Sequence, residues 1–136
     1  MKKLIALISL SLLFFLPSVA TDRVEAPLNL TDLSVYFKTG SSKELARYFD
    51  HAINLNINGQ KGDYSRNHAE FLLKDFFIKF PPDDFKVLHK GGNQGPVVFF
   101  VGSYFTDSKQ FRILIKGTHK NELIKIYSIE IIKIRI

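Results

Sequence analysis

One helix-length pattern constrains the fold of this chain more than any other feature of its sequence. Between Ser65 and Phe80, apolar residues recur at alternating steps of three and one, which places them in one continuous stripe along a helix. Ser65 is a favourable N-cap, and Pro81-Pro82 cannot continue a helix. The stripe consists of Ala69, Leu72, Leu73, Phe76, Phe77 and Phe80. The sequence therefore predicts a long amphipathic helix that must be covered by a broad apolar surface.

The segments on both sides of this helix predict a sheet that supplies such a surface. Four later segments read as strands separated by turns: 85–90, 97–105, 111–116 and 123–134. In the last of them the apolar parity changes between Ile126 and Ile129, which indicates a β-bulge. Before the helix, residues 51–58 alternate as a strand does, and Asn58-Gly59 is a hairpin signal.

Two short helices are predicted ahead of the hairpin. Thr31 and Asp32 can cap the first, and Gly40 is a natural end for it. Ser41 to Glu44 matches a capping box and predicts the start of the second. The order of elements predicts a cone-shaped α+β domain, in which a strongly bent antiparallel sheet of about four strands wraps around the long helix.

The first twenty residues have the pattern of a secretory signal peptide. Lys2 and Lys3 precede an uncharged apolar run over residues 4–16, and small residues at Ser18 and Ala20 suit a signal peptidase. The run is shorter than the roughly 20 residues that a membrane-spanning helix needs. We therefore predict cleavage after Ala20, a flexible lead-in over 21–30 and a single domain over 31–136. The protein is expected to be periplasmic or secreted, without a transmembrane segment after signal cleavage.

Composition narrows the classes of partner. The chain has no cysteine, so packing alone must stabilise it, without disulfides. Without Lys2 and Lys3, 17 of its 19 basic residues remain against 13 acidic ones, a net charge of +4. This mild excess favours anionic ligands or surfaces outside the cell and does not favour nucleic acid.

Several segments together resemble a known family. They read LARYFDHAINLNI, YSRNHAEFLLKDFF, FKVLHKGG, VGSYFTDSKQFRILI and IYSIEII. They resemble a family of short exported bacterial proteins of uncharacterised function within the nuclear transport factor 2-like superfamily, whose fold is a cystatin-like α+β cone. The resemblance runs from about Leu33 to Ile132. It implies a ligand pocket between the concave sheet face and the helices, but this fold hosts both enzymes and binding domains.

The candidate pocket residues leave two functional hypotheses open. Tyr36 and Tyr48 lie on the early helices, and Asp50 lies at the entry to the first strand. His51 and His89 share the parity of the apolar residues in their strands, so both are expected to point inward. The first hypothesis is non-catalytic binding of a small apolar or anionic ligand, or of a protein. The second is a proton-transfer enzyme, of isomerase or dehydratase type, in which Asp50, His51 or His89 is the base.

Neither a metal nor a cofactor is predicted. The four histidines show no paired spacing such as i, i+4, and no thiolate is present. Glu130 has the outward parity in its strand, so no second carboxylate is expected in the pocket.

The strand over 97–105 predicts an interface. It is apolar on both faces, and helices can cover only one of them. On the outer face we expect Leu88, Leu114 and the outward member of the pair Phe99 and Phe100, edged by basic residues. The resemblance also implies association through this sheet surface, so a homodimer is expected.

Overall fold

The computed structural model describes residues 28–135 except 93 and 122. The predicted signal peptide (1–20) and residues 21–27 of the predicted lead-in lie outside the described residues. In the rest of the lead-in, Leu28 is buried and Asn29 caps the first helix. The folded part therefore begins before residue 31. No helix in the described ranges is long and apolar enough to cross a membrane.

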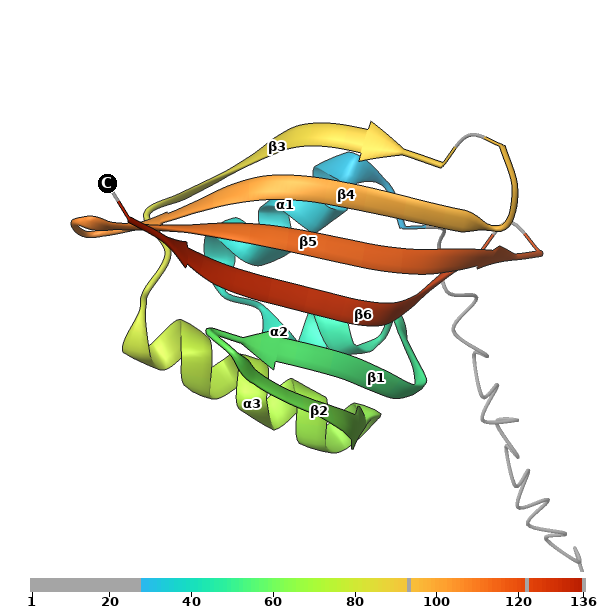
Figure 1. Ribbon diagram of the computed structural model, residues 1–136, viewed down its shortest axis with the longest axis horizontal. Helices are drawn as coiled ribbons and strands as arrows, with labels where there is room; N and C mark the ends of the chain where they lie inside the picture. The colour runs from blue at the N-terminus through green and yellow to red at the C-terminus, as the bar shows by residue number, and fades with distance from the viewer. Residues whose placement is uncertain (1–27, 93, 122, 136) are drawn as a thin grey trace, which may run out of the picture.

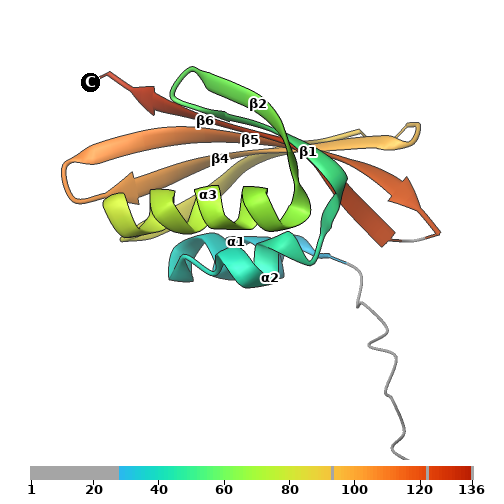
Figure 2. The same cartoon turned by 90° about the horizontal axis from the view of Figure 1, so that it is seen from below.

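Three helices cover one face of a curved sheet (Figures 1 and 2). The helices are α1 (Leu30–Thr39), α2 (Ser42–Ala46) and α3 (Arg66–Lys79). The strands are β1 (Phe49–Ile57), β2 (Gln60–Ser65), β3 (Asp84–Gly91), β4 (Val97–Thr106), β5 (Lys109–Lys120) and β6 (Leu123–Ile134). This confirms the α+β class.

The sheet corrects the prediction of about four antiparallel strands. It is a mixed sheet of six strands in the order β2-β1-β6-β5-β4-β3. The β1–β2 hairpin joins it because β1 runs parallel to β6, where Leu55 is opposite Ile129. Alternation along a segment predicts a strand but carries no information on its partner, so this pairing could not be read from the local pattern.

The helix ends agree with the predictions in part. In α3 the Ser65 hydroxyl accepts a hydrogen bond from the amide of His68 at 3.3 Å, so this helix and its cap are confirmed. In α1 the cap is Asn29, whose side chain accepts from the amide of Asp32 at 2.8 Å. Gly40 ends α1 with φ 63°, in the left-handed region that glycine tolerates.

The capping box predicted for the second helix is wrong. Ser41 makes no side-chain capping hydrogen bond. Glu44 instead accepts a hydrogen bond from Arg47 at 2.9 Å, an ion pair at i, i+3. Arg47 lies one turn from Glu44 and so takes the carboxylate that a capping box would direct to the Ser41 amide. The helix is also short, since α2 ends at Ala46 and β1 starts at Phe49.

An aromatic cluster fills the core between α3 and the sheet. The ring of Phe76 lies 5.2 to 5.8 Å, between centroids, from those of four other aromatic residues. These are Phe77, Phe80, Tyr104 and Phe111. The predicted bulge in the last strand is confirmed, because Ile126 is opposite Gly117 and Ser128 opposite Lys116, which leaves Tyr127 as the extra residue. The bulge lets both halves of β6 direct isoleucines into this core.

Candidate functional site

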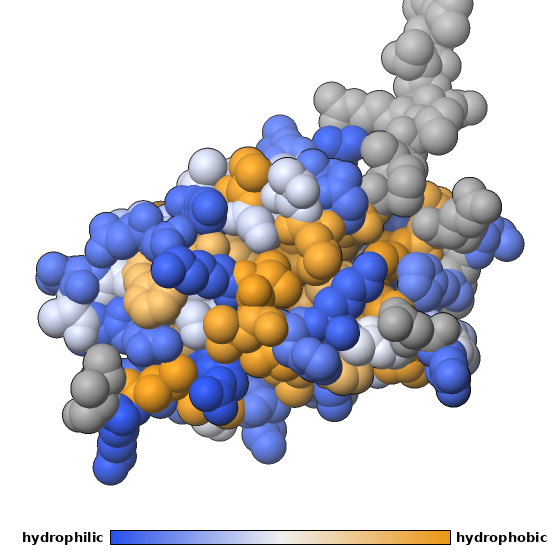
Figure 3. All heavy atoms as spheres, turned by 90° about the horizontal axis from the view of Figure 1, so that it is seen from above, coloured by the Kyte–Doolittle hydropathy of each residue, from blue (hydrophilic) through white to orange (hydrophobic). Residues whose placement is uncertain are grey.

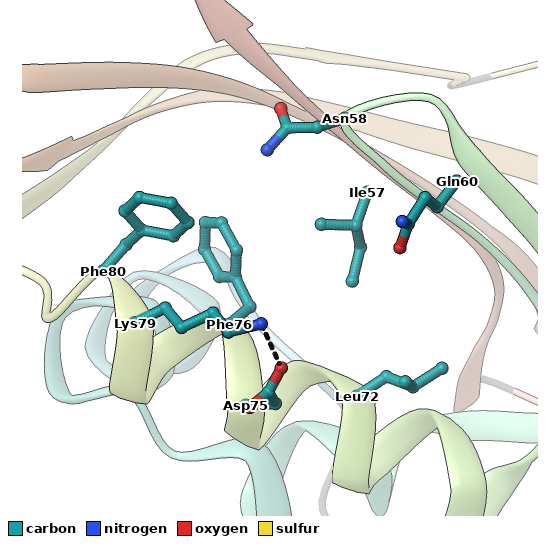
Figure 4. Close-up of a pocket in the computed structure, with 8 residues that line it drawn as sticks. All are labelled: Ile57, Asn58, Gln60, Leu72, Asp75, Phe76, Lys79 and Phe80. Atoms are coloured by element: carbon teal, nitrogen blue, oxygen red, sulfur yellow. Dashed lines mark ion pairs between the residues drawn. The ribbon is translucent and has the colours of Figure 1, made fainter.

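A cavity of about 310 Å³ lies at one end of the domain, between α3 and the β1–β2 hairpin (Figure 4). It is lined by Ile57, Asn58, Gln60, Leu72, Asp75, Phe76, Lys79 and Phe80. The resemblance had implied a pocket under the concave face, but the aromatic cluster occupies the space beneath β4 and β5. The cavity therefore lies beside the β1–β2 hairpin and not beneath the centre of the sheet.

The cavity has an apolar floor and a polar rim. Ile57, Leu72 and Phe80 are half-buried, and Phe76 is buried beneath them. At the rim, the Lys79 ammonium lies 3.0 Å from the Asp75 carboxylate, one helical turn away on α3. Figure 4 shows this ion pair facing the hairpin residues across the opening. Ligand pockets combine an apolar lining with a few polar groups in this way.

The hairpin turn fixes the opposite rim. Asn58 has φ 52°, and its side-chain oxygen accepts a hydrogen bond from the amide of Lys133 in β6 at 3.0 Å. The sequence predicted only a turn at Asn58, and the rim was not predicted. The i, i+4 spacing of Asp75 and Lys79 could have indicated part of this rim, because it places both charges on one side of the helix.

Tyr36 and Tyr48 form a pair far from this cavity. Their rings stack with centroids 6.3 Å apart, and the two hydroxyls are hydrogen-bonded. Burial, with the hydrogen bond to Tyr36, raises the pKa of Tyr48 to about 12, so its hydroxyl stays protonated even at moderately alkaline pH. Tyr48 precedes β1 and Asn58 follows it, so roughly 30 Å of strand separates the pair from the cavity, at about 3.3 Å per residue.

The structure does not bring the two candidate histidines together. His51 is exposed on β1 and His89 is exposed on β3, with β6, β5 and β4 between them. At about 4.8 Å per strand, roughly 19 Å of sheet separates them. The Asp50 carboxylate accepts a hydrogen bond from the amide of His51 at 2.8 Å, a local contact beside the strand entry.

The inward orientation predicted for His89 is wrong because β3 contains a bulge. Val87 is opposite Gly102 and His89 is opposite Val101, so Leu88 is the extra residue. His89 is thereby turned to the outer face, where its ring lies 5.7 Å from that of Phe99. The strict alternation assumed from the sequence ends at Val87.

The residues predicted for the interface divide between the two faces. Phe100 is buried at 2% exposure in the core, so the outward member of the pair is Phe99. Leu114 lies opposite Val101 on the outer face, and Leu88 is 58% exposed at the bulge. Figure 3 views the molecule onto the β3 edge of the sheet and shows hydrophobic side chains gathered across the middle of that side, with hydrophilic ones around them.

The described residues contain no group of three or more His, Cys, Asp or Glu side chains that could hold a metal ion. Glu130 is opposite Leu114 on the outer face, which confirms the orientation predicted for it.

Comparison with known proteins places these features in a family. A model described as a domain of unknown function, DUF4783, matches residues 30–131. No curated protein matches the sequence.

Crystal structures of two DUF4783 proteins are similar to this chain. The protein from Bacteroides fragilis is 31% identical, with a TM-score of 0.70, over 75% of this chain and 95% of that one. The protein from Bacteroides ovatus is 28% identical, with a TM-score of 0.72, over 76% and 94% of the two chains. A nuclear transport factor 2-like protein of unknown function from Silicibacter pomeroyi shares the fold, at 13% identity and a TM-score of 0.54, over 75% and 87%.

Proposed function

Because the chain belongs to the DUF4783 family and has a nuclear transport factor 2-like fold, we propose that it is a non-catalytic binding domain of the periplasm or cell envelope. The observation that carries this proposal is the cavity between α3 and the hairpin, with its apolar floor and its charged and amide-bearing rim. Its volume of about 310 Å³ suits a small molecule or one large side chain of a partner.

The chemistry of the lining indicates the class of ligand. The floor would bind an apolar body, and the Lys79–Asp75 ion pair, Asn58 and Gln60 would bind polar groups at one end. The ligand is thus a small amphipathic molecule, or a protein segment with an apolar anchor.

The alternative, a proton-transfer enzyme, is less well supported by the geometry. It needs a base and a hydrogen-bond donor that converge on one bound molecule. Here His51 and His89 are on separate strands, and the Tyr36–Tyr48 pair is at the far end of β1 from the cavity. None of these candidates lines the cavity.

We also propose that the protein is exported, because residues 1–20 have the pattern of a secretory signal peptide. The lack of cysteine is unusual for an oxidising compartment but is compatible with export. The outer sheet face, with Phe99 and Leu114 at its centre, is proposed to pair two copies of the chain.

One experiment tests both export and binding. The protein is recovered from the exported fraction of its own host and weighed by native mass spectrometry. We expect a chain that begins at Thr21 and carries a small-molecule adduct, which identifies the ligand.

Variants connect the adduct to the cavity. Leu72→Trp fills the floor and should remove the adduct, whereas Ile78→Trp, on the exposed side of the same helix, should keep it. An adduct that survives Leu72→Trp would contradict this site, and a chain that keeps its first twenty residues inside the cell would contradict export.

A further inference from the structure

A second cavity, of about 230 Å³, lies between α2 and α3, away from the site proposed above. It is lined by Lys43, Ala46, Arg47, Arg66 and Glu70. Ala46 is buried, so an apolar residue forms part of its wall while charged side chains form the remainder. Arg66 and Glu70 belong to the first two turns of α3, whereas the α3 residues that line the first cavity start at Leu72.

The guanidinium of Arg66 is the unusual group in this second cavity. Its Nε atom is buried and has no hydrogen-bond partner. The ion pairs found in the described part of the chain, Lys38–Asp84, Arg47–Glu44 and Lys79–Asp75, do not include Arg66. Glu70 is one turn further along α3 and lines the same cavity, but it is not within ion-pair distance of Arg66. Buried N–H groups in folded proteins nearly always have an acceptor, so the position of Arg66 calls for one.

The neighbouring cations make an anionic acceptor favourable. Arg47 lies at the end of α2 and uses one donor on Glu44, at 2.9 Å, out of the five that a guanidinium carries. Lys43 is exposed on the same wall. Three cations therefore line the cavity with one carboxylate, that of Glu70, while Glu44 is paired with Arg47. Arginine forks match the oxygens of carboxylate, phosphate and sulfate groups, and such charge-assisted hydrogen bonds are stronger than neutral ones.

From this arrangement we propose that the α2–α3 cavity binds the oxyanion group of an anionic ligand through Arg66 and Arg47. Arg66 supplies the buried donor, Arg47 and Lys43 supply charge, and Glu70 limits the affinity while it offers an acceptor to a hydroxyl or amine beside the anion. The site is independent of the α3–hairpin cavity, and neither proposal rests on the other.

The Arg66 Nε–H signal in ¹H–¹⁵N NMR spectra reports directly on this site. The protein is titrated separately with inorganic phosphate, sulfate and acetate at constant ionic strength maintained with sodium chloride. We expect a saturable shift of the Arg66 signal, and the anion that binds most tightly identifies the class of oxyanion. Shifts that grow linearly with each salt, without saturation, would overturn the proposal.

Three variants separate a built site from general attraction to a basic surface. Arg66→Gln should weaken binding about tenfold or more, because it removes a charged donor. Arg112→Gln, an equal charge change on the outer sheet face, should leave the affinity unchanged.

Glu70→Gln should tighten binding, because it removes a repelling carboxylate. This expectation can be tested even if Arg66→Gln fails to fold. Equal weakening by Arg66→Gln and Arg112→Gln, or no gain from Glu70→Gln, would overturn the assignment. Leu72→Trp should not alter anion binding, which separates this test from that of the first cavity.

Discussion

At the scale of single residues, Tyr104 combines apolar packing with a hydrogen bond in the core. Its side chain is fully buried, and its ring packs on Phe76, Phe77 and Phe111. Its hydroxyl donates to the carbonyl of Phe80, the residue that follows α3. Burial raises the pKa of Tyr104, so the hydroxyl stays protonated and remains a donor. The strand β4 therefore fixes the C-terminal end of α3.

We expect Tyr104→Phe to lower the free energy of unfolding by about 1–3 kcal/mol, because the Phe80 carbonyl loses its partner while the ring remains. Urea denaturation followed by circular dichroism measures this. Tyr127→Phe, at the partly exposed bulge of β6, is the matched control and should change stability by less than about 0.5 kcal/mol. An equal effect of both substitutions would show that the hydrogen bond contributes nothing specific.

At the scale of elements, the edge strand β3 packs closely against β4 at a glycine. Phe85 lies over Gly102, where an added Cβ would lie 2.3 Å from the tip of the Phe85 ring and 3.2 Å from the carbonyl oxygen of Lys86. Phe85 also stacks on Phe37 of α1, with ring centroids 4.7 Å apart. Gly102 therefore leaves room for the aromatic contact that joins β3 to the helical layer.

Gly102→Ala should destabilise the fold by about 1–3 kcal/mol, because the methyl group overlaps the Phe85 ring. In a Phe85→Leu background the smaller side chain makes room, so the same substitution should cost less. A double-mutant cycle in urea denaturation measures this coupling. A cost of Gly102→Ala that does not depend on residue 85 would mean that the backbone, rather than the ring, resists the methyl group.

The sequence predicted correctly those features that depend on residue spacing within a single helix or strand. The stripe from Ala69 to Phe80 and the parity change in β6 depend only on spacing, and both were predicted correctly. The bulge in β3 carried no such signal, because Leu88 and His89 are both compatible with either face, and His89 was therefore oriented wrongly. The cavity rim was missed because Asn58 and Lys79 line the same cavity only after the hairpin folds over α3.

At the scale of the whole molecule, the outer sheet face is the surface best suited to a second copy of the chain. Phe99, Val101 and Leu114 lie on it in neighbouring strands, and Arg112 and Lys116 lie beside them on β5. The ring of Phe99 also covers Gly91 of β3, which keeps Phe99 only partly exposed. An apolar centre with charged neighbours is typical of protein interfaces.

Phe99→Glu should convert the proposed dimer into a folded monomer, because it places a charge at the centre of the contact. Light scattering coupled to size-exclusion chromatography measures the mass, and circular dichroism verifies the fold. Ile78→Glu, on the exposed side of α3, should leave the dimer intact. A Phe99→Glu variant that keeps twice the chain mass would exclude this face.

The parallel pairing of β1 with β6 also governs when the domain can fold. The strand that lies between β1 and β5 is β6, which follows the other described strands in the sequence, whereas its partner β1 precedes them. Among the described strands, the β1–β2 hairpin is joined to β3, β4 and β5 through β6. Such long-range contacts fold slowly, because a large loop must close before they form. The export proposed above would require the chain to remain unfolded until it has crossed a membrane, and slow formation of the β1–β6 pairing would favour this.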